Sequence, residues 1–179
     1  MTEDRLTTLI SAQEIAARID VLGKEIRAHY GEKTIVLVAV MRGSFMFLAD
    51  LARAIPGPVE IGFLGVSSYK GTNSTGNVRI THDLGDEIKG SHVLLVEDIV
   101  DTGLTISFIR ELLMVRKPAS LNLVTFLDKP VNREVEVPVE FVGFSVPDHF
   151  VVGYGLDLDQ RYRNLPYLAV YHPEVEGGQ

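Results

Sequence analysis

Residues 93–105 read VLLVEDIVDTGLT, and this segment contains the main indications of the fold. Its first four residues are aliphatic, which is typical of a strand that is buried on both faces of a sheet. Two adjacent carboxylates, Glu97 and Asp98, follow directly, and Asp101, Thr102 and Gly103 come after them. We therefore expect a buried strand over residues 92–96 that ends at a pair of carboxylates and continues into a tight polar loop.

A helix is expected directly after this loop, over residues 104–115. Apolar side chains recur there at helical spacing, at Ile106, Ile109, Leu112 and Leu113. A glycine-containing loop that leads into a helix directs backbone N–H groups and the positive end of the helix dipole at an anion, and the hydroxyls of Thr102 and Thr105 add donors. Open α/β sheets bind ligands at the carboxyl ends of their strands, so this segment predicts an anion site beside the carboxylates.

The composition of the 179 residues restricts the class of protein. Hydrophobic residues make up 46% of the chain, which excludes a disordered chain and is enough for a substantial core. Cysteine is absent, so a disulfide framework or thiolate metal site is excluded, in keeping with a reducing cytoplasm. The net charge of −7 argues against a broad nucleic-acid surface or an anionic membrane as the main partner. We also expect no secretory signal and no membrane span, because the apolar runs that these need do not occur.

The rest of the chain predicts an alternating α/β domain. Ser11 and Glu14 form a capping-box pattern at the start of a helix that ends at Gly31. A strand, a helix and a second strand over residues 34–66 form a βαβ unit, for which a right-handed crossover is expected. We find no linker sequence and expect a single domain over residues 1–179. The other predicted elements are a helix at 45–55 and strands at 34–40, 59–66, 78–81, 121–127, 139–146, 150–154 and 167–171.

Residues 67–77 interrupt this pattern. The segment reads SSYKGTNSTGN, in which small polar residues and glycines dominate and Tyr69 is the one aromatic side chain. Long loops of this kind in compact domains are usually functional lids or disordered connections. We expect a mobile loop over these residues, and the hypothesis is that it closes over a ligand during a reaction that must exclude water.

Four segments together resemble one enzyme family. Residues 67–69 read SSY, residues 97–103 read EDIVDTG, residues 127–130 read LDKP and residues 150–157 read FVVGYGLD. They resemble the type I purine phosphoribosyltransferases, specifically the bacterial hypoxanthine and hypoxanthine-guanine phosphoribosyltransferases, over about residues 35–170. The resemblance implies an α/β fold with a central, mostly parallel sheet flanked by helices and a small hood formed by N- and C-terminal segments. The implied core covers about residues 34–146, and the implied hood comprises the N-terminal helix and about residues 147–173.

The resemblance implies a reaction of purine salvage. A 6-oxopurine base, hypoxanthine or guanine, takes the ribose 5-phosphate unit from phosphoribosyl pyrophosphate, and IMP or GMP and pyrophosphate are released. C1 of the ribose becomes cation-like in this transfer, and Mg²⁺, the implied cofactor, neutralises the departing pyrophosphate. The implied enzyme is cytoplasmic, is a homodimer or homotetramer, and binds neither nucleic acid nor a membrane.

The resemblance also assigns roles to individual residues. The implied catalytic residues are Asp101, Ser68 and Tyr69. Phosphoribosyl pyrophosphate or the nucleotide would be bound by Arg42, Gly43, Glu97, Asp98, Asp101, Thr102, Gly103, Leu104, Thr105 and Arg163. The purine would be bound by Lys129, Phe150, Val151 and Asp157, and Mg²⁺ by Glu97, Asp98 and Asp157. A cis peptide bond is implied between Met41 and Arg42.

Three of these roles can be compared with the chemistry of the side chains. Asp101 would face N7 of the purine as a general base, and the alternative is a helix N-cap, which aspartate also favours. Lys129 would donate to O6 of the base, and this donor would select a 6-oxopurine because a 6-amino group would leave the donor unpaired. Arg163 would bind pyrophosphate through the rigid donor fork of its guanidinium group.

Two positions depart from the family pattern. Arg42 stands where many relatives have lysine, and His149 stands where lysine is common beside the purine site. The second departure leaves the preference among hypoxanthine, guanine and xanthine open. Two other classes of function are alternatives. One is an RNA-binding regulator of similar fold, which the acidic charge disfavours, and the other is a receiver or dinucleotide-binding module, whose G-x-G-x-x-G fingerprint is missing from the chain.

Overall fold

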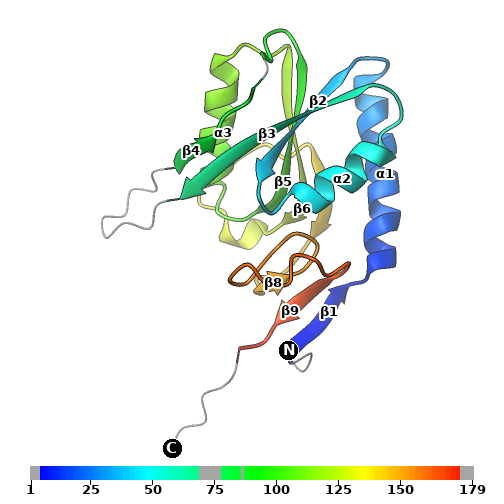
Figure 1. Cartoon of the computed structure of the whole chain (residues 1–179), viewed down its shortest axis with the longest axis vertical. Coiled ribbons are helices and arrows are strands. Elements are labelled where there is room, and N and C mark those ends of the chain that lie inside the picture. The colour runs from blue at the N-terminus through cyan, green and yellow to red at the C-terminus, as the bar shows by residue number, and fades with distance from the viewer. Residues whose placement is uncertain (1–4, 69–77, 86, 174–179) are drawn as a thin grey trace, which may run out of the picture.

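A mostly parallel sheet forms the centre of the molecule (Figure 1). The computed structural model describes residues 5–68, 78–85 and 87–173. Within this part of the chain, six strands lie in the order β4-β3-β2-β5-β6-β7. Neighbouring strands are parallel except for β3 and β4, which confirms the predicted sheet. The strands are β2 (Ile35–Met41), β3 (Val59–Ser68), β4 (Val78–His82), β5 (His92–Val100), β6 (Ser120–Asp128) and β7 (Phe141–Ser145).

Helices cover both faces of this sheet (Figure 1). α1 (Ala12–Tyr30) and α2 (Phe45–Ala54) pack on one face, and α3 (Leu104–Val115) packs on the other. The aliphatic residues of β5 explain this arrangement, because Leu94 and Val96 join the core beneath α1 and α2, whereas Val93 and Leu95 join the core beneath α3. β5 is therefore buried on both faces, as its composition predicts. A short 3-10 helix, η2 (Pro130–Asn132), follows β6.

Both predicted ends of the first helix are confirmed. The Ser11 hydroxyl accepts a hydrogen bond from the Glu14 amide, and the Glu14 carboxylate accepts one from the Ser11 amide, so the capping box is complete. Gly31 ends α1 with a positive φ of 61°, and its N–H donates to the Arg27 carbonyl at 2.8 Å. These local signals fix the length of α1, and its apolar face then packs against the central sheet.

A second, antiparallel sheet lies beyond one end of the central sheet (Figure 1). In the described residues it has three strands in the order β1-β9-β8, namely β1 (Leu6–Ile10), β9 (Leu168–Tyr171) and β8 (Val151–Val152). It joins the N-terminal and C-terminal segments of the chain, as expected for the hood. The N-terminal strand of this sheet is β1, which the sequence did not predict, whereas α1 packs against α2 and the central sheet.

Several predicted boundaries were wrong by a few residues. β5 does not end at Val96 but continues to Val100, so Glu97 and Asp98 belong to the strand. β3 includes Ser67 and Ser68, which we had assigned to the loop at 67–77, and β7 and β8 are shorter than predicted. The remainder of the predicted loop, residues 69–77, and the tail after Pro173 lie outside the described residues.

The topology of the central sheet defines where a ligand would bind. The chain leaves β2 through α2 toward β3 on one side, and leaves β5 through α3 toward β6 on the other. Strand order therefore reverses between β2 and β5, and open α/β sheets bind ligands in the crevice at the carboxyl ends of such a strand pair. In the part of the chain that the structure describes, no helix is long and apolar enough to cross a membrane.

Candidate active site

The crevice between β2 and β5 contains the carboxylates that the sequence singled out. β5 pairs with β2 only as far as Val96, which lies opposite Ala39. From Glu97 onward β5 is paired with β6 alone, so the side of β5 that faces the end of β2 is free of strand pairing. The turn that follows β2 at residues 42–44 occupies this side, which places the predicted pyrophosphate turn beside the carboxylate pair.

The contact between Gly43 and Asp98 is closer than any other side chain at position 43 would permit. A Cβ atom on Gly43 would lie 1.5 Å from Oδ2 of Asp98. The carbonyl oxygen of Gly43 also faces Gly155, where a Cβ atom would lie 2.1 Å from it. Gly43 therefore joins three segments, because the carboxylate of β5 and the backbone at Gly155 both press against its main chain. The peptide bond between Met41 and Arg42 is cis, as expected.

Glu97 and Asp98 are carboxylates in a poorly solvated environment. Glu97 is buried, and its Oε2 atom has no hydrogen-bond partner among the described residues. Burial raises the pKa of Glu97 well above its usual value, and the neighbouring Asp98 raises it further. Burial also raises the pKa of Asp98 to about 6, although the Ile99 amide and the charge of Arg163 act in the opposite direction. A cation bound at this pair would be favoured, because it would offset the cost of two buried negative charges.

The loop at residues 101–103 brings β5 into α3. Gly103 is the N-cap of α3 and has a φ of 85°, and a Cβ atom there would lie 2.3 Å from the Val135 carbonyl oxygen. The Thr102 carbonyl accepts hydrogen bonds from the amides of Glu134 and Val135 at 2.9 and 3.0 Å, and these bonds fix the loop to the segment that follows η2. The alternative that Asp101 is the N-cap of the helix is therefore wrong. The Leu104 amide, the first of α3, donates to Thr102 Oγ1 at 3.4 Å, and a helix N-terminus of this kind favours an anion.

Asp101 and Lys129 are placed side by side by the pairing of β5 with β6. Val100 lies opposite Asp128 in the strand register, and the Lys129 amide donates to the Val100 carbonyl at 2.9 Å. Asp101 and Lys129 are thus the next residues along two paired strands. The Oδ1 atom of Asp101 is buried and has no hydrogen-bond partner among the described residues. A buried acceptor without a partner is costly unless a ligand supplies the donor.

The predicted purine residues come from β6 and from the start of the hood. Lys129 is only 7% exposed, and its Nζ atom donates to the His149 carbonyl at 2.5 Å. His149 therefore meets Lys129 through its backbone, while its own side chain is exposed. Phe150 follows and is 53% exposed, so one ring face is available for stacking, whereas Val151 is buried in β8. The backbone at position 149 thus contributes to this pocket whatever side chain stands there.

In the hood, Arg163, predicted to bind pyrophosphate, is joined to Asp157, predicted to bind the purine and Mg²⁺. Arg163 Nη2 lies 2.8 Å from Asp157 Oδ1, and Arg163 Nη1 donates to the Gly155 carbonyl at 2.7 Å. Asp157 Oδ2 also accepts from the Gln160 amide at 2.8 Å. Arg42 reaches the same group from the other side, because its Nη1 atom donates to Gln160 Oε1 at 3.4 Å. The two predicted arginines therefore approach one region from different parts of the chain.

The predicted Mg²⁺ ligands are only partly brought together. Among the described residues no three His, Cys, Asp or Glu side chains are close enough to hold a metal ion, so Glu97, Asp98 and Asp157 do not form one preassembled cluster. Asp157 is instead paired with Arg163. Carboxylate oxygens are still the ligands that Mg²⁺ prefers, and the unpartnered Glu97 Oε2 suits such an ion. Mg²⁺ commonly uses one or two carboxylates together with waters and substrate phosphates, so the residues fit an ion that binds together with its substrate.

Two residues of the site were not predicted. Arg133 is half-buried and forms an ion pair with Asp128, and its Nη1 atom has no partner among the described residues. Its side chain also lies against Gly103, where a Cβ atom would be 3.2 Å from Arg133 Cδ. No pattern in the sequence separates Arg133 from surface arginines. Tyr154 is the second residue of the site that the sequence did not predict. Of the predicted catalytic residues in the loop, Ser68 ends β3 opposite Val78, and Tyr69 lies outside the described residues.

The fold and the site define a phosphoribosyltransferase, and comparison with known proteins agrees. The model of the phosphoribosyl transferase domain family matches residues 6–159. The chain therefore belongs to the phosphoribosyltransferase family. It is 56% identical over 174 residues to the hypoxanthine phosphoribosyltransferase of Haemophilus influenzae, with 94% of this chain and 97% of that protein covered.

Two further relatives give the same result. The chain is 44% identical to the hypoxanthine-guanine phosphoribosyltransferase of Bacillus subtilis, with 98% of each chain covered. The crystal structure of a hypoxanthine phosphoribosyltransferase from Staphylococcus aureus superposes with a TM-score of 0.92 at 44% identity, covering 98% of this chain and 96% of that one. The expected bacterial branch of the family is thereby confirmed.

The raised pKa of Asp98 predicts a specific dependence of stability on pH. The folded chain keeps the Asp98 proton up to about pH 6, whereas the unfolded chain loses it near 3.8, so this contribution to stability is complete below pH 3.8 and is lost as the pH rises through 6. Replacing Asp98 by Asn should therefore reduce the decline in unfolding free energy between pH 4 and 7 by about 1–3 kcal/mol. Urea unfolding of the unliganded chain measures this difference. The change Asp20→Asn, on the exposed side of α1, is the matched control, and parallel profiles for wild type and Asp98→Asn would contradict the assignment.

Proposed function

We propose that the chain transfers the 5-phosphoribosyl group from phosphoribosyl pyrophosphate to hypoxanthine, and also to guanine, with release of IMP or GMP and pyrophosphate. The observation that carries this proposal is the adjacency of Asp101 and Lys129 at the ends of two paired strands. N7 and O6 of a 6-oxopurine lie next to each other on one edge of the base. The Asp101 carboxylate can accept from N7 when the free base carries its proton there, and the Lys129 ammonium can donate to a 6-substituent that is an acceptor.

The residues on each side of this pair supply the rest of the substrate site. The amides and hydroxyls at residues 102–105 suit the 5′-phosphate, because they lie at the N-terminus of α3. Glu97 and Asp98 suit the ribose hydroxyls and Mg²⁺. Arg42, Asp157 and Arg163 suit the pyrophosphate end, with Asp157 also near the ion that accompanies it. Phe150 can stack on the base opposite these polar groups.

The transfer itself requires few groups from the protein. N9 of the base forms a bond to C1 of the ribose as the bond from C1 to the pyrophosphate oxygen breaks. Asp101 accepts the proton that the base loses, at the buried Oδ1 atom that has no other partner. Mg²⁺, when bound with the substrate, neutralises charge on the leaving pyrophosphate. Arg163 holds the same leaving group in a poorly solvated position, where its charge acts strongly.

We further propose that the chain acts in the cytoplasm and as a homodimer or homotetramer. The absence of cysteine supports a reducing compartment. Self-association is supported by large apolar side chains that remain exposed along β2, α2 and β3, namely Met41, Phe45, Ile61 and Phe63. Ile61 and Phe63 lie opposite Leu37 and Ala39 in the strand register, so they occupy one face of the sheet.

Replacing Asp101 by Asn should remove most of the catalytic rate while leaving substrate binding intact. The change keeps the size of the side chain but removes the proton acceptor, which typically lowers turnover by about 10²–10⁴-fold. Steady-state kinetics with hypoxanthine, phosphoribosyl pyrophosphate and Mg²⁺ measure the loss, with Asp20→Asn as the control. Wild-type turnover in the Asp101→Asn enzyme would remove Asp101 from the mechanism, and a wild-type chain without transferase activity on any 6-oxopurine would refute the function.

Replacing Lys129 by Ala should weaken binding of the base and the choice among bases. A hydrogen bond from a buried cation is worth about 1.5–3 kcal/mol, so the KM for hypoxanthine should rise about 10–100-fold and discrimination against adenine should fall. The KM for phosphoribosyl pyrophosphate should change little, since Lys129 lies on the base side of the pocket. Lys24→Ala, on an exposed position of α1, is the control. An unchanged ratio of hypoxanthine to adenine turnover would show that Lys129 does not read O6.

A further inference from the structure

The segment at residues 153–155 makes an unusual turn beside the site. Gly153, Tyr154 and Gly155 have φ values of 102°, 48° and 100°, so three successive residues have positive φ. Glycine adopts this region freely, but tyrosine does not. A non-glycine residue persists there only where the surrounding structure holds it in place. The contacts of Tyr154 therefore hold its backbone at a positive φ, which the pairing of β8 with β9 does not explain.

This turn connects the two groups that are assigned to pyrophosphate. Gly155 presses against the Gly43 carbonyl, so that a Cβ atom at Gly155 would lie 2.1 Å from it. The Gly155 carbonyl accepts from Arg163 Nη1 at 2.7 Å, and the Gly155 amide donates to the Arg163 carbonyl at 3.0 Å. The position of Tyr154, one residue earlier, therefore affects both the placement of Arg163 and its distance from the turn at residues 42–44.

The side chain of Tyr154 anchors the turn to the central domain. Tyr154 is 6% exposed, and its ring centroid lies 4.8 Å from that of Phe126 in β6. Its hydroxyl donates a short hydrogen bond to the Asp50 carboxylate in α2. Burial raises the pKa of Tyr154, and the Asp50 carboxylate raises it further, so the hydroxyl stays protonated and remains a donor. This bond joins residues 104 positions apart in the chain.

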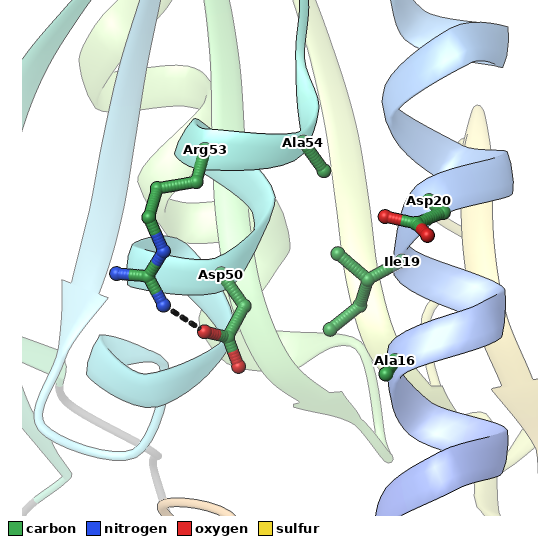
Figure 2. A pocket seen from close by; sticks show the side chains of 6 residues that line it. All are labelled: Ala16, Ile19, Asp20, Asp50, Arg53 and Ala54. Atoms are coloured by element: carbon green, nitrogen blue, oxygen red, sulfur yellow. Dashed lines mark hydrogen bonds and ion pairs between the residues drawn. The ribbon is translucent and has the colours of Figure 1, made fainter.

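Asp50 connects this hydrogen bond to the turn at residues 42–44, which lies on the other side of the site. It belongs to α2, which begins at Phe45 directly after the turn that contains Arg42 and Gly43. Figure 2 shows Asp50 with its ion-pair partner Arg53 on α2, and Ile19 and Asp20 on α1, among the residues that line a groove of about 290 Å³. The Asp50 carboxylate is therefore paired both with Arg53, through Oδ1, and with the Tyr154 hydroxyl, through Oδ2.

We propose that the Tyr154–Asp50 pair is a positioning device for the pyrophosphate end of the substrate. The pair fixes the segment from Gly155 to Arg163 against the turn at residues 42–44, so that the donors of Arg163 and of the turn converge on one pyrophosphate. The inference rests on the proposed function for the identity of the ligand. It assigns no contact between Tyr154 and the substrate, and it places the effect at the pyrophosphate end, away from the base and the 5′-phosphate.

The experiment compares variants that remove either partner of this bond. Tyr154→Phe removes the donor, and Asp50→Ala removes the acceptor. Each should raise the KM for phosphoribosyl pyrophosphate and the dissociation constant for pyrophosphate with Mg²⁺ by about tenfold, while the KM for hypoxanthine stays within about twofold. The double variant should be no worse than either single variant, because both remove the same interaction. Asp50→Asn keeps an acceptor and should lie between wild type and Asp50→Ala.

A matched control separates positioning from general stability. Tyr30 is also buried, and its hydroxyl donates to the Val93 carbonyl and accepts from Asn122, at the amino-terminal end of β5. Tyr30→Phe should therefore lower the thermal stability without raising the KM for phosphoribosyl pyrophosphate. The inference is overturned if Tyr154→Phe and Asp50→Ala both leave that KM and the pyrophosphate dissociation constant unchanged, or if Tyr30→Phe raises them equally.

The same measurements distinguish failure of this inference from failure of the proposed function. A wild-type chain that transfers no phosphoribosyl group to any 6-oxopurine refutes the function. Calorimetric titration with pyrophosphate and Mg²⁺ still tests the positioning pair in that case, because it needs no turnover. If Tyr154→Phe does not fold, Asp50→Ala and Asp50→Asn decide the question, since Asp50 is a partly exposed residue of α2.

Discussion

The close approach of Gly43 to Asp98 is the constraint on which the site depends. The carboxylate occupies the space where any other residue would carry Cβ, at 1.5 Å from that atom's position. This approach requires β5 to run on past the end of β2, and it requires the turn after β2 to bend toward β5. The carbonyl oxygen of Gly43 also lies against Gly155. Gly43, which has no side chain, therefore brings together three parts of the protein. These are the turn after β2, the Asp98 carboxylate of β5 and the hood at Gly155.

The electrostatics of the site follow from this packing. Glu97 is buried and Asp98 lies against Gly43, and burial raises the pKa of both groups. Such a pair has a high affinity for a cation, and the arginines at its border suit the anion that accompanies that cation. Asp101 and Lys129 follow directly after the paired ends of β5 and β6. The crevice thus separates a pyrophosphate end from a base end.

The sequence predicted the parts of this arrangement that arise from local patterns. The aliphatic run at residues 93–96 and the spacing after Gly103 gave β5 and α3, and Ser11 with Glu14 gave the start of α1. The extension of β5 through Glu97 and Asp98 was not predicted, because carboxylates are rare in strands, whereas pairing with β6 continues the strand to Val100. β1 was not predicted because its sequence shows only a weak strand pattern. The strand is stabilised by antiparallel pairing with β9, which is distant in the chain. The bond between Tyr154 and Asp50 joins distant residues, and no periodicity indicates it.

The most direct test of this account is the binding of phosphoribosyl pyrophosphate to Gly43→Ala, compared with Gly85→Ala. Gly85 has open space where its Cβ would be, so its replacement should leave both fold and binding unchanged. Gly43→Ala should keep the secondary structure seen by circular dichroism, but should weaken binding by about 100-fold, because the added methyl group displaces the turn from Asp98. Binding of phosphoribosyl pyrophosphate by Gly43→Ala within about twofold of wild type would contradict the account.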